Sequence, residues 1–175
     1  MEQPTTIDEI VTMLDDSRRA FHAATDSIPD AQANAKPAAA SWSVLEIVEH
    51  VAKVEDSFYG LLQKAQVLDA PSISRAKESQ LASQVKDRST KVEAPEFVRP
   101  QGRFTSLYQA LAEFDAGRAR MIQFAQQQGQ GLYSLHTIHP RRGPMNGVEL
   151  MTVAANHALR HVEQVKETVA ALASK

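Results

Sequence analysis

The 175-residue sequence contains no cysteine, and this absence restricts both its covalent structure and its metal chemistry. Disulfide bonds and thiolate-based zinc sites are excluded. A bound metal ion would therefore need histidine, carboxylate or water as its ligands. The chain also has no thiol of its own to offer in a reaction.

Long basic runs and long apolar runs are missing as well. The formal net charge is −2, and the basic residues are not clustered. Nucleic acid is not an expected partner, because binding to phosphates needs clustered Lys and Arg. No apolar run reaches the roughly 18 residues of a membrane helix, and the N-terminus has neither the basic nor the apolar region of a signal peptide. We therefore expect a cytoplasmic protein that does not insert into membranes.

What the sequence does contain is the composition of an ordinary globular domain. Hydrophobic residues make up 43% of the chain and charged residues 23%. A chain of this length is long enough to bury a proper core but short for two such domains. The sequence therefore predicts one domain over residues 1–175.

Four long segments have apolar residues three and four positions apart, the spacing of amphipathic helices. They cover approximately residues 7–27, 43–64, 104–128 and 146–172. No segment has a convincing alternation of apolar and polar residues, so we expect no strands. The pattern predicts an all-α four-helix bundle with a long crossover between the second and third helices.

Three of these helices have a recognisable start. In a capping box, a small polar residue before the helix pairs with Glu three positions later. The pairs are Thr6 with Glu9, Ser43 with Glu46, and Asn146 with Glu149. In the second and fourth helices, an apolar residue before the cap can also contact one on the first turns.

The segment from residue 70 to 103 is harder to interpret, because prolines interrupt it. Residues 76–86 can form a short helix with a thin apolar face. A loop of this length inside a compact domain is often functional, as a lid or a wall of a site. The segment 136–144 is rich in turn residues and cannot be helical throughout.

The histidines are the main candidates for chemistry. His157 and His161 stand four apart, which places two imidazoles on one face of the fourth helix. His50 lies on the buried face expected for the second helix and is the best candidate for a third metal ligand. Three histidines leave open positions on a divalent ion, as catalysis requires. The alternative is that they are partly buried polar residues bonded to backbone or water.

Other polar residues have weaker signals. Glu46 lies one turn before His50, and Gln164 one turn after His161, so each could bind a ligand histidine or a bound water. Both could equally be surface residues. His139 could line the cleft or bond to its own turn, and neither it nor His136 is predicted to be a ligand.

The adjacent Arg141 and Arg142 could bind an anionic group, although adjacent loop arginines are usually solvated. His22, on the first helix, is expected at the surface.

Several of these motifs, taken together and in order, resemble the DinB-like (DinB/YfiT-like) superfamily of metal-dependent enzymes. The resemblance rests on WSVLEIVEHVA at 42–52, PEFVRPQGR at 95–103, HPRRGPMN at 139–146 and ANHALRHVEQ at 155–164. Each motif is short, but their order covers nearly the whole chain. Asn156 departs from the family pattern, which has another small or an apolar residue there.

The resemblance implies an up-down-down-up order of the four helices and a homodimer. It also implies a metal site formed by His50, His157 and His161, with zinc or nickel as the typical ion and iron, manganese or cobalt as alternatives. Characterised relatives include S-transferases that use bacillithiol, mycothiol or glutathione, and a maleylpyruvate isomerase.

Three functional hypotheses follow. The first is an S-transferase that joins a small-molecule thiol to an electrophilic substrate, with the thiol activated on the metal site. The second is a metal-dependent hydrolase, which would use water at the same site. The third is a non-catalytic, stress-related bundle in which the metal site is structural or vestigial. The sequence does not choose between transfer and hydrolysis, because both need the same open site.

Overall fold

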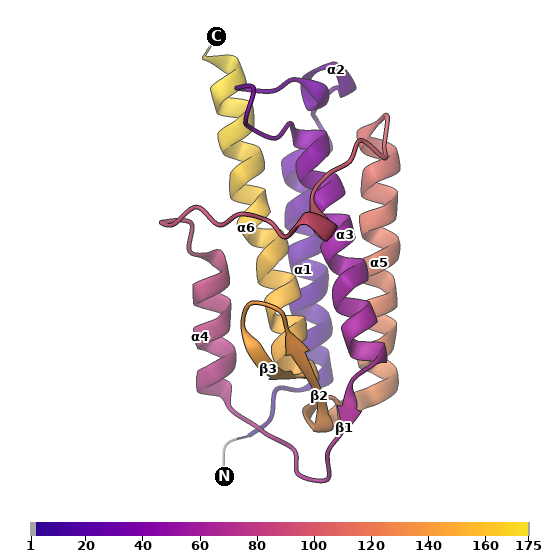
Figure 1. Ribbon diagram of the computed structural model, residues 1–175. Helices are drawn as coiled ribbons and strands as arrows, with labels where there is room; N and C mark the ends of the chain where they lie inside the picture. The colour runs from indigo at the N-terminus through magenta and orange to yellow at the C-terminus, as the bar shows by residue number, and fades with distance from the viewer. Residues whose placement is uncertain (1–2, 175) are drawn as a thin grey trace.

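Four long helices lie side by side in the computed structural model, which describes residues 3–174 (Figure 1). They are α1 (Ile7–Thr25), α3 (Val44–Gln63), α5 (Leu107–Gln128) and α6 (Gly147–Ala173). Helices α1 and α6 run in one direction, and α3 and α5 run in the other. The all-α four-helix bundle and its up-down-down-up order are therefore confirmed.

The capping boxes determine where three of the helices begin. In α1, α3 and α6 the cap side chain accepts the N–H of the third helical residue, and that Glu accepts the N–H of the cap. Helix α5 begins at Leu107, three residues after the predicted start near Phe104. The reason is that the Ser106 side chain accepts the N–H of Gln109, which makes Ser106 the N-cap.

The short helix predicted in the crossover from α3 to α5 is present as α4 (Arg75–Lys86). Its thin apolar face, Leu81 and Val85, is buried, and α4 packs against α6 outside the bundle. A 3-10 turn, η1 (Glu96–Val98), lies further along the crossover and contacts α3. A short helix, α2 (Asp30–Asn34), was not predicted in the linker before α3.

The expectation of no strands was wrong. Strands β1 (Gln66–Val67), β2 (Leu135–His139) and β3 (Gly143–Asn146) form a small antiparallel sheet in the order β1-β2-β3. A second 3-10 turn, η2 (Gly129–Ser134), leads from α5 into β2. The turn-rich segment is thus a hairpin, in which His139 pairs with Gly143 across three connecting residues. Gly143 has φ +76, a conformation that favours glycine in such hairpins.

The bundle core contains an ion pair as well as apolar side chains. Arg118 of α5 and Glu55 of α3 are both fully buried, with N–O distances of 2.9 and 2.6 Å. Arg118 also donates to the carbonyl of Leu14 and the hydroxyl of Ser17, so α1 shares the same network. In the part of the chain that the structure describes, no helix is long and apolar enough to cross a membrane.

Candidate metal centre

The three predicted histidines come together where α3 faces α6. The Nε2 atom of His157 lies 3.3 Å from that of His50 and 3.1 Å from that of His161. One ligand nitrogen from each ring lies within 4.8 Å of the other two. Two segments more than 100 residues apart in the chain therefore form one cluster of imidazoles.

Outer hydrogen bonds fix the tautomers of two of these rings. Nδ1 of His50 lies 2.8 Å from the carbonyl oxygen of Val98, and Nδ1 of His161 lies 2.7 Å from Oε1 of Gln164. Both oxygens can only accept, so each Nδ1 carries the proton and each Nε2 presents a lone pair to the cluster. The contact predicted between Gln164 and His161 is present.

Glu46 has a different role from the one predicted for a partner of His50. Its carboxylate accepts the N–H of Ser43 in the capping box and forms an ion pair with Lys36 at 2.8 Å. The N-cap of α3 thus occupies one oxygen of Glu46, and Lys36 of the preceding linker occupies the other. The partner of His50 is instead a backbone carbonyl of the crossover, which a search for side chains in the sequence does not find.

Two of the three nitrogen–nitrogen distances in the cluster match those around a divalent ion. Metal–nitrogen distances of about 2.0–2.1 Å place neighbouring ligand nitrogens about 3.0–3.4 Å apart, as the two short distances here do. His157 differs from the usual arrangement, in which the second nitrogen of each ligand is also bonded. Its Nδ1 is buried and has no partner among residues 3–174. The donor set can hold a metal, with His157 the least constrained of the three rings.

Burial keeps these rings in the neutral form that binds metals. It lowers the pKa of His50, with a further contribution from the charge of Lys53. The pKa values of His157 and His161 lie well below the usual value for the same reason, and the other histidines of the cluster lower them further. At neutral pH a cation would therefore not have to displace protons from the ligand nitrogens.

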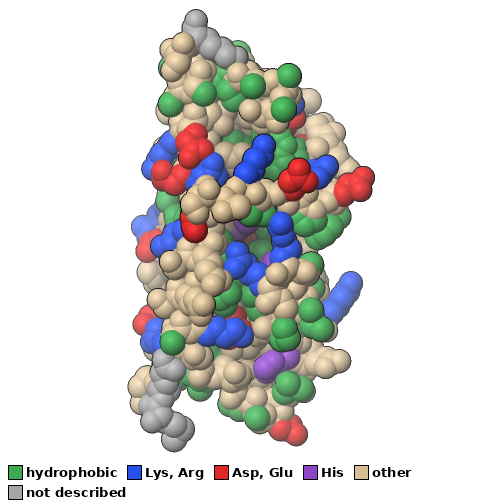
Figure 2. All heavy atoms as spheres, turned by 60° about the vertical axis from the view of Figure 1, so that its left-hand side comes forward, with side chains coloured by type: hydrophobic (Ala, Val, Ile, Leu, Met, Phe, Trp, Pro, Cys, Tyr) green, Lys and Arg blue, Asp and Glu red, His purple; other side chains and the backbone are tan. Residues whose placement is uncertain are grey.

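A pocket of about 1190 Å³ opens above the cluster. Its walls come from the segment before α3, the end of α4, the crossover and the β2–β3 hairpin. Figure 2 shows this hollow, with histidine side chains inside it and Lys and Arg side chains around its edge. The Trp42 ring lies 5.0 Å from that of His50, and Phe58 lies beside His157 at 6.4 Å. The cluster is thus reached from solvent through a pocket with apolar surfaces next to the imidazoles.

Glu49, which the sequence did not single out, fastens the crossover to α3. Its carboxylate is 1% exposed and accepts the backbone N–H groups of Gln101, Gly102 and Arg103 at 2.7, 3.0 and 3.0 Å. These residues follow closely on Val98, whose carbonyl holds His50. The one signal in the sequence was its position directly before a candidate ligand, His50.

His139 both lines the pocket and bonds to its own turn, so both predicted alternatives hold. Its Nδ1 accepts the N–H of Arg141 at 3.1 Å. Burial, together with the positive charges of Arg142 and Arg141, lowers the pKa of His139 to about 4. Phe58 contacts both His139 and His157, and His139 is not part of the cluster.

The other two histidines lie outside the cluster. His136 is in β2, opposite Asn146. His22 was expected at the surface but is partly buried. Burial acts to lower its pKa, but hydrogen bonds to Asp115 and Asp26 outweigh this effect and raise it.

Comparisons with known proteins agree with this fold. The sequence model of the DinB superfamily matches residues 13–165. YuaE of Bacillus subtilis, an uncharacterised protein, is 28% identical over 140 residues, which cover 80% of this chain and 85% of YuaE.

Two solved structures are similar in fold. TT2238, described as a four-helix bundle protein, has a TM-score of 0.60 and 23% identity over 93% of this chain and 99% of its own. YfiT of Bacillus subtilis has a TM-score of 0.65 and 14% identity over 99% of this chain and 92% of its own. YfiT is described as a probable metal-dependent hydrolase with an unusual four-helix bundle topology. At these identities the likeness concerns the fold.

Proposed function

Because the chain belongs to the DinB superfamily, we propose that His50, His157 and His161 hold a divalent metal ion and that the protein is a metal-dependent enzyme. The observation that carries this proposal is the convergence of three neutral imidazoles below an open pocket. Zinc or nickel suits such a nitrogen donor set, and iron, manganese or cobalt are alternatives. We propose that two copies of the chain form the working unit, as in the family.

The reaction that we propose first is transfer of an electrophilic substrate to a low-molecular-weight thiol. The three histidines would hold a divalent ion, and such an ion would supply the means to lower the pKa of a thiol or of water at neutral pH. The carboxylates that line the pocket, Asp87, Glu93 and Glu167, are exposed at its edge. A thiol, with a pKa of about 8.5, depends less than water on a separate general base, which favours transfer.

The residues around the cluster would hold the reactants and exclude water. Val98 and Gln164 keep the protons of His50 and His161 on Nδ1, so that the Nε2 lone pairs stay directed at the cluster. Trp42 and Phe58 give the inner pocket an apolar surface for the carbon parts of a substrate. The pocket volume is large enough for a small thiol and a second substrate together.

Hydrolysis is the second candidate, because YfiT, which has the same fold, is described as a probable metal-dependent hydrolase. It needs the same three histidines and differs in the nucleophile. A strict requirement for added thiol supports transfer, and turnover without thiol supports hydrolysis. A metal that raises the melting temperature without any turnover supports the non-catalytic alternative.

The test is the metal content of protein purified without an affinity tag. We expect about one ion per chain in the wild type and a loss of most of it in His161→Ala, since two imidazoles seldom make a site. His22→Ala is the matched control, because it removes a histidine outside the cluster. Metal well below one equivalent in both the wild type and the control would overturn the proposal.

A further inference from the structure

Among the residues that the structure describes, the guanidinium groups of three pocket arginines hydrogen-bond only to neutral groups. Arg141, on the turn between β2 and β3, donates to the carbonyl of Glu93 at 2.9 Å. The neighbouring Arg142 donates to the side-chain amide of Gln84 at 3.4 Å. Arg160 of α6 donates to the carbonyls of Val85 and Asp87 at the end of α4. These three residues are called the arginine wall below.

The other pocket arginines have acidic partners. Arg88 forms an ion pair with Glu167, and Arg99 lies 3.7 Å from the carboxylate of Glu93. Within residues 3–174, by contrast, no carboxylate lies within 4.0 Å of a guanidinium nitrogen of the arginine wall. The charge of the Asp87 carboxylate acts on Arg160 from beyond this distance, so the protein offsets only part of the positive charge that the wall adds to the pocket.

These charges act on one another and on the imidazoles. Burial and the charge of Arg141 lower the pKa of Arg142. Burial and the charge of Arg88 lower the pKa of Arg160, the charge of Asp87 opposes this effect, and Arg142 and Arg141 lower the pKa further. All three arginines line the same pocket as the histidine cluster, so their positive potential acts on whatever enters that pocket.

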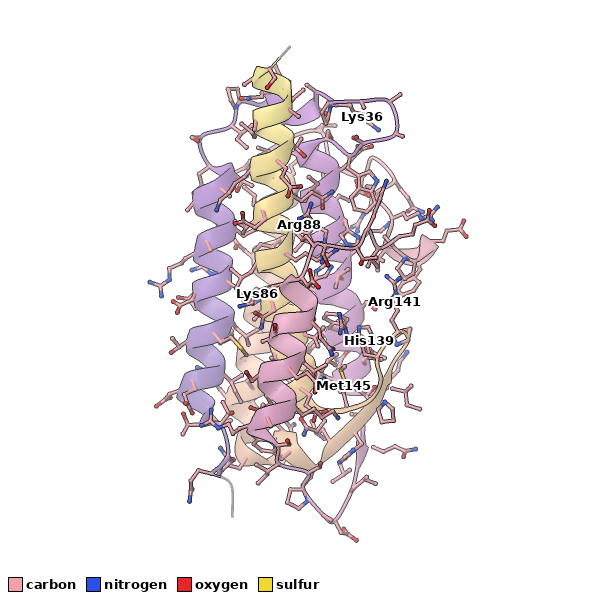
Figure 3. The ribbon with its side chains drawn as sticks, turned by 90° about the vertical axis from the view of Figure 1, so that its left-hand side faces the viewer. Lys36, Lys86, Arg88, His139, Arg141 and Met145 are labelled. Carbon is pink, nitrogen blue, oxygen red and sulfur yellow. The ribbon has the colours of Figure 1, made fainter. Side chains whose placement is uncertain are left out.

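Two elements hold the wall in place. The three-residue turn of the hairpin carries Arg141 and Arg142, and the His139 ring accepts the backbone N–H of Arg141. Arg160 precedes His161 directly on α6, which fixes its distance from the cluster. In Figure 3, Arg141 and His139 lie on the hairpin, on the same side of the bundle as Arg88 at the end of α4.

We propose that Arg141, Arg142 and Arg160 bind a carboxylate or phosphate group of the substrate, so that the enzyme acts on small organic anions. Guanidinium groups are suited to both ligands, because their planar N–H donors match two oxygens at once. The anionic group would bring negative charge to the three guanidinium groups. Its binding there would direct the uncharged part of the substrate towards the histidines. This inference rests on the proposed function for what happens at the cluster, but not for the binding of the anion.

Trp42 gives a direct measurement, because it is the only tryptophan of the chain and lines the same pocket. The probes are iodide, an anionic quencher of tryptophan fluorescence, and acrylamide, a neutral one. The protein is kept in chelator at constant ionic strength, so the result does not depend on bound metal. We expect the double variant Arg141→Gln/Arg142→Gln to lower the iodide quenching constant roughly twofold and to leave that of acrylamide unchanged.

The matched control is Arg18→Gln/Arg19→Gln on α1, which removes the same two charges outside the pocket. Arg160→Gln is tested separately, because Arg160 also anchors the end of α4, and circular dichroism verifies that each variant is folded. Inorganic phosphate and succinate are then added as competitors, and protection of Trp42 from iodide by one or the other identifies the preferred anionic group.

The inference is overturned if the pocket variants change iodide quenching no more than the α1 control does, or if neither competitor protects. Metal content distinguishes this failure from failure of the proposed function. A wall that binds anions in a protein that holds no metal would refute only the metal site. A loaded metal site with no preference for anions would refute only the wall.

Discussion

Replacing Glu49 with glutamine is expected to loosen the crossover and, through it, to weaken metal binding at the proposed site. The carboxylate accepts three backbone N–H groups, one at Oε1 and two at Oε2. An amide keeps only one of these oxygens and turns an NH₂ group towards an N–H donor. At least one hydrogen bond is therefore lost, and the others no longer involve a charged acceptor.

The expected cost follows from these bonds. Hydrogen bonds to a charged group contribute about 1.5–3 kcal/mol each, and neutral ones about half as much. Because the carboxylate is 1% exposed, water does not replace the lost acceptor. We expect the free energy of unfolding to fall by about 2–4 kcal/mol, and the melting temperature by about 5–12 °C for a chain of this size.

Two assays separate the effect on the loop from the effect on the site. Urea unfolding of the metal-free protein measures the stability. A competition titration against a coloured chelator, far below the melting temperature, measures the metal affinity. We expect about a tenfold loss of affinity, because the Val98 carbonyl that orients His50 is held less firmly.

The control is Glu163→Gln, which removes an exposed carboxylate paired only with Lys166 and should change stability by less than about 0.5 kcal/mol. Wild-type stability in Glu49→Gln would show that the three hydrogen bonds do not hold the crossover. Lowered stability with unchanged metal affinity would show that the crossover does not orient His50.

Two further substitutions test the electrostatics of the interior. Between about pH 6.5 and about 4 the unfolded chain binds a proton that folded His139 does not, so stability should fall as the pH falls through this window. In His139→Asn the amide can still accept the Arg141 N–H. Between pH 7 and pH 4.5, urea unfolding should show that the free energy of unfolding of this variant falls by about 2 kcal/mol less than that of the wild type, after a discount for solvent at the pocket. An unchanged pH dependence would contradict this. Arg118→Met leaves Glu55 buried without its partner and should lower the free energy of unfolding by about 3–5 kcal/mol. The double variant Arg118→Met/Glu55→Leu should recover most of that loss. A double variant as unstable as the single one would show that the cost does not come from an unpaired Glu55.

The helices could be predicted because their signals are local. A capping box acts within four residues, and all three predicted boxes form. The sheet depends on pairing across the chain, as between Gln66 and His136, and its strands are too short to show an alternating pattern. Ser106 was missed although Gln109 lies three positions later, where Gln can replace Glu in a capping box. In the structure the Gln109 side chain accepts from Thr105 instead, so only half of the box forms.

The site was predictable to a similar degree. Spacing places His157 and His161 on one face, while the position of His50 beside them depends on how α3 packs against α6. The partners of Glu49 and His50 are backbone groups, which any residue type provides, so no motif points to them. Gln164 could be found because it lies within one turn of its histidine.

The residues that line the pocket come both from packed helices and from connecting segments. The imidazoles are on α3 and α6 in the bundle. The arginines of the hairpin, and the crossover residues that line the pocket, are on connecting segments. Connecting segments tolerate substitution and changes of length far better than packed helices. Under the proposed function, substrate range can therefore change by exchange of the hairpin turn while the centre stays intact, whereas the crossover also holds His50 through Val98. This makes the hairpin turn the natural target for library design.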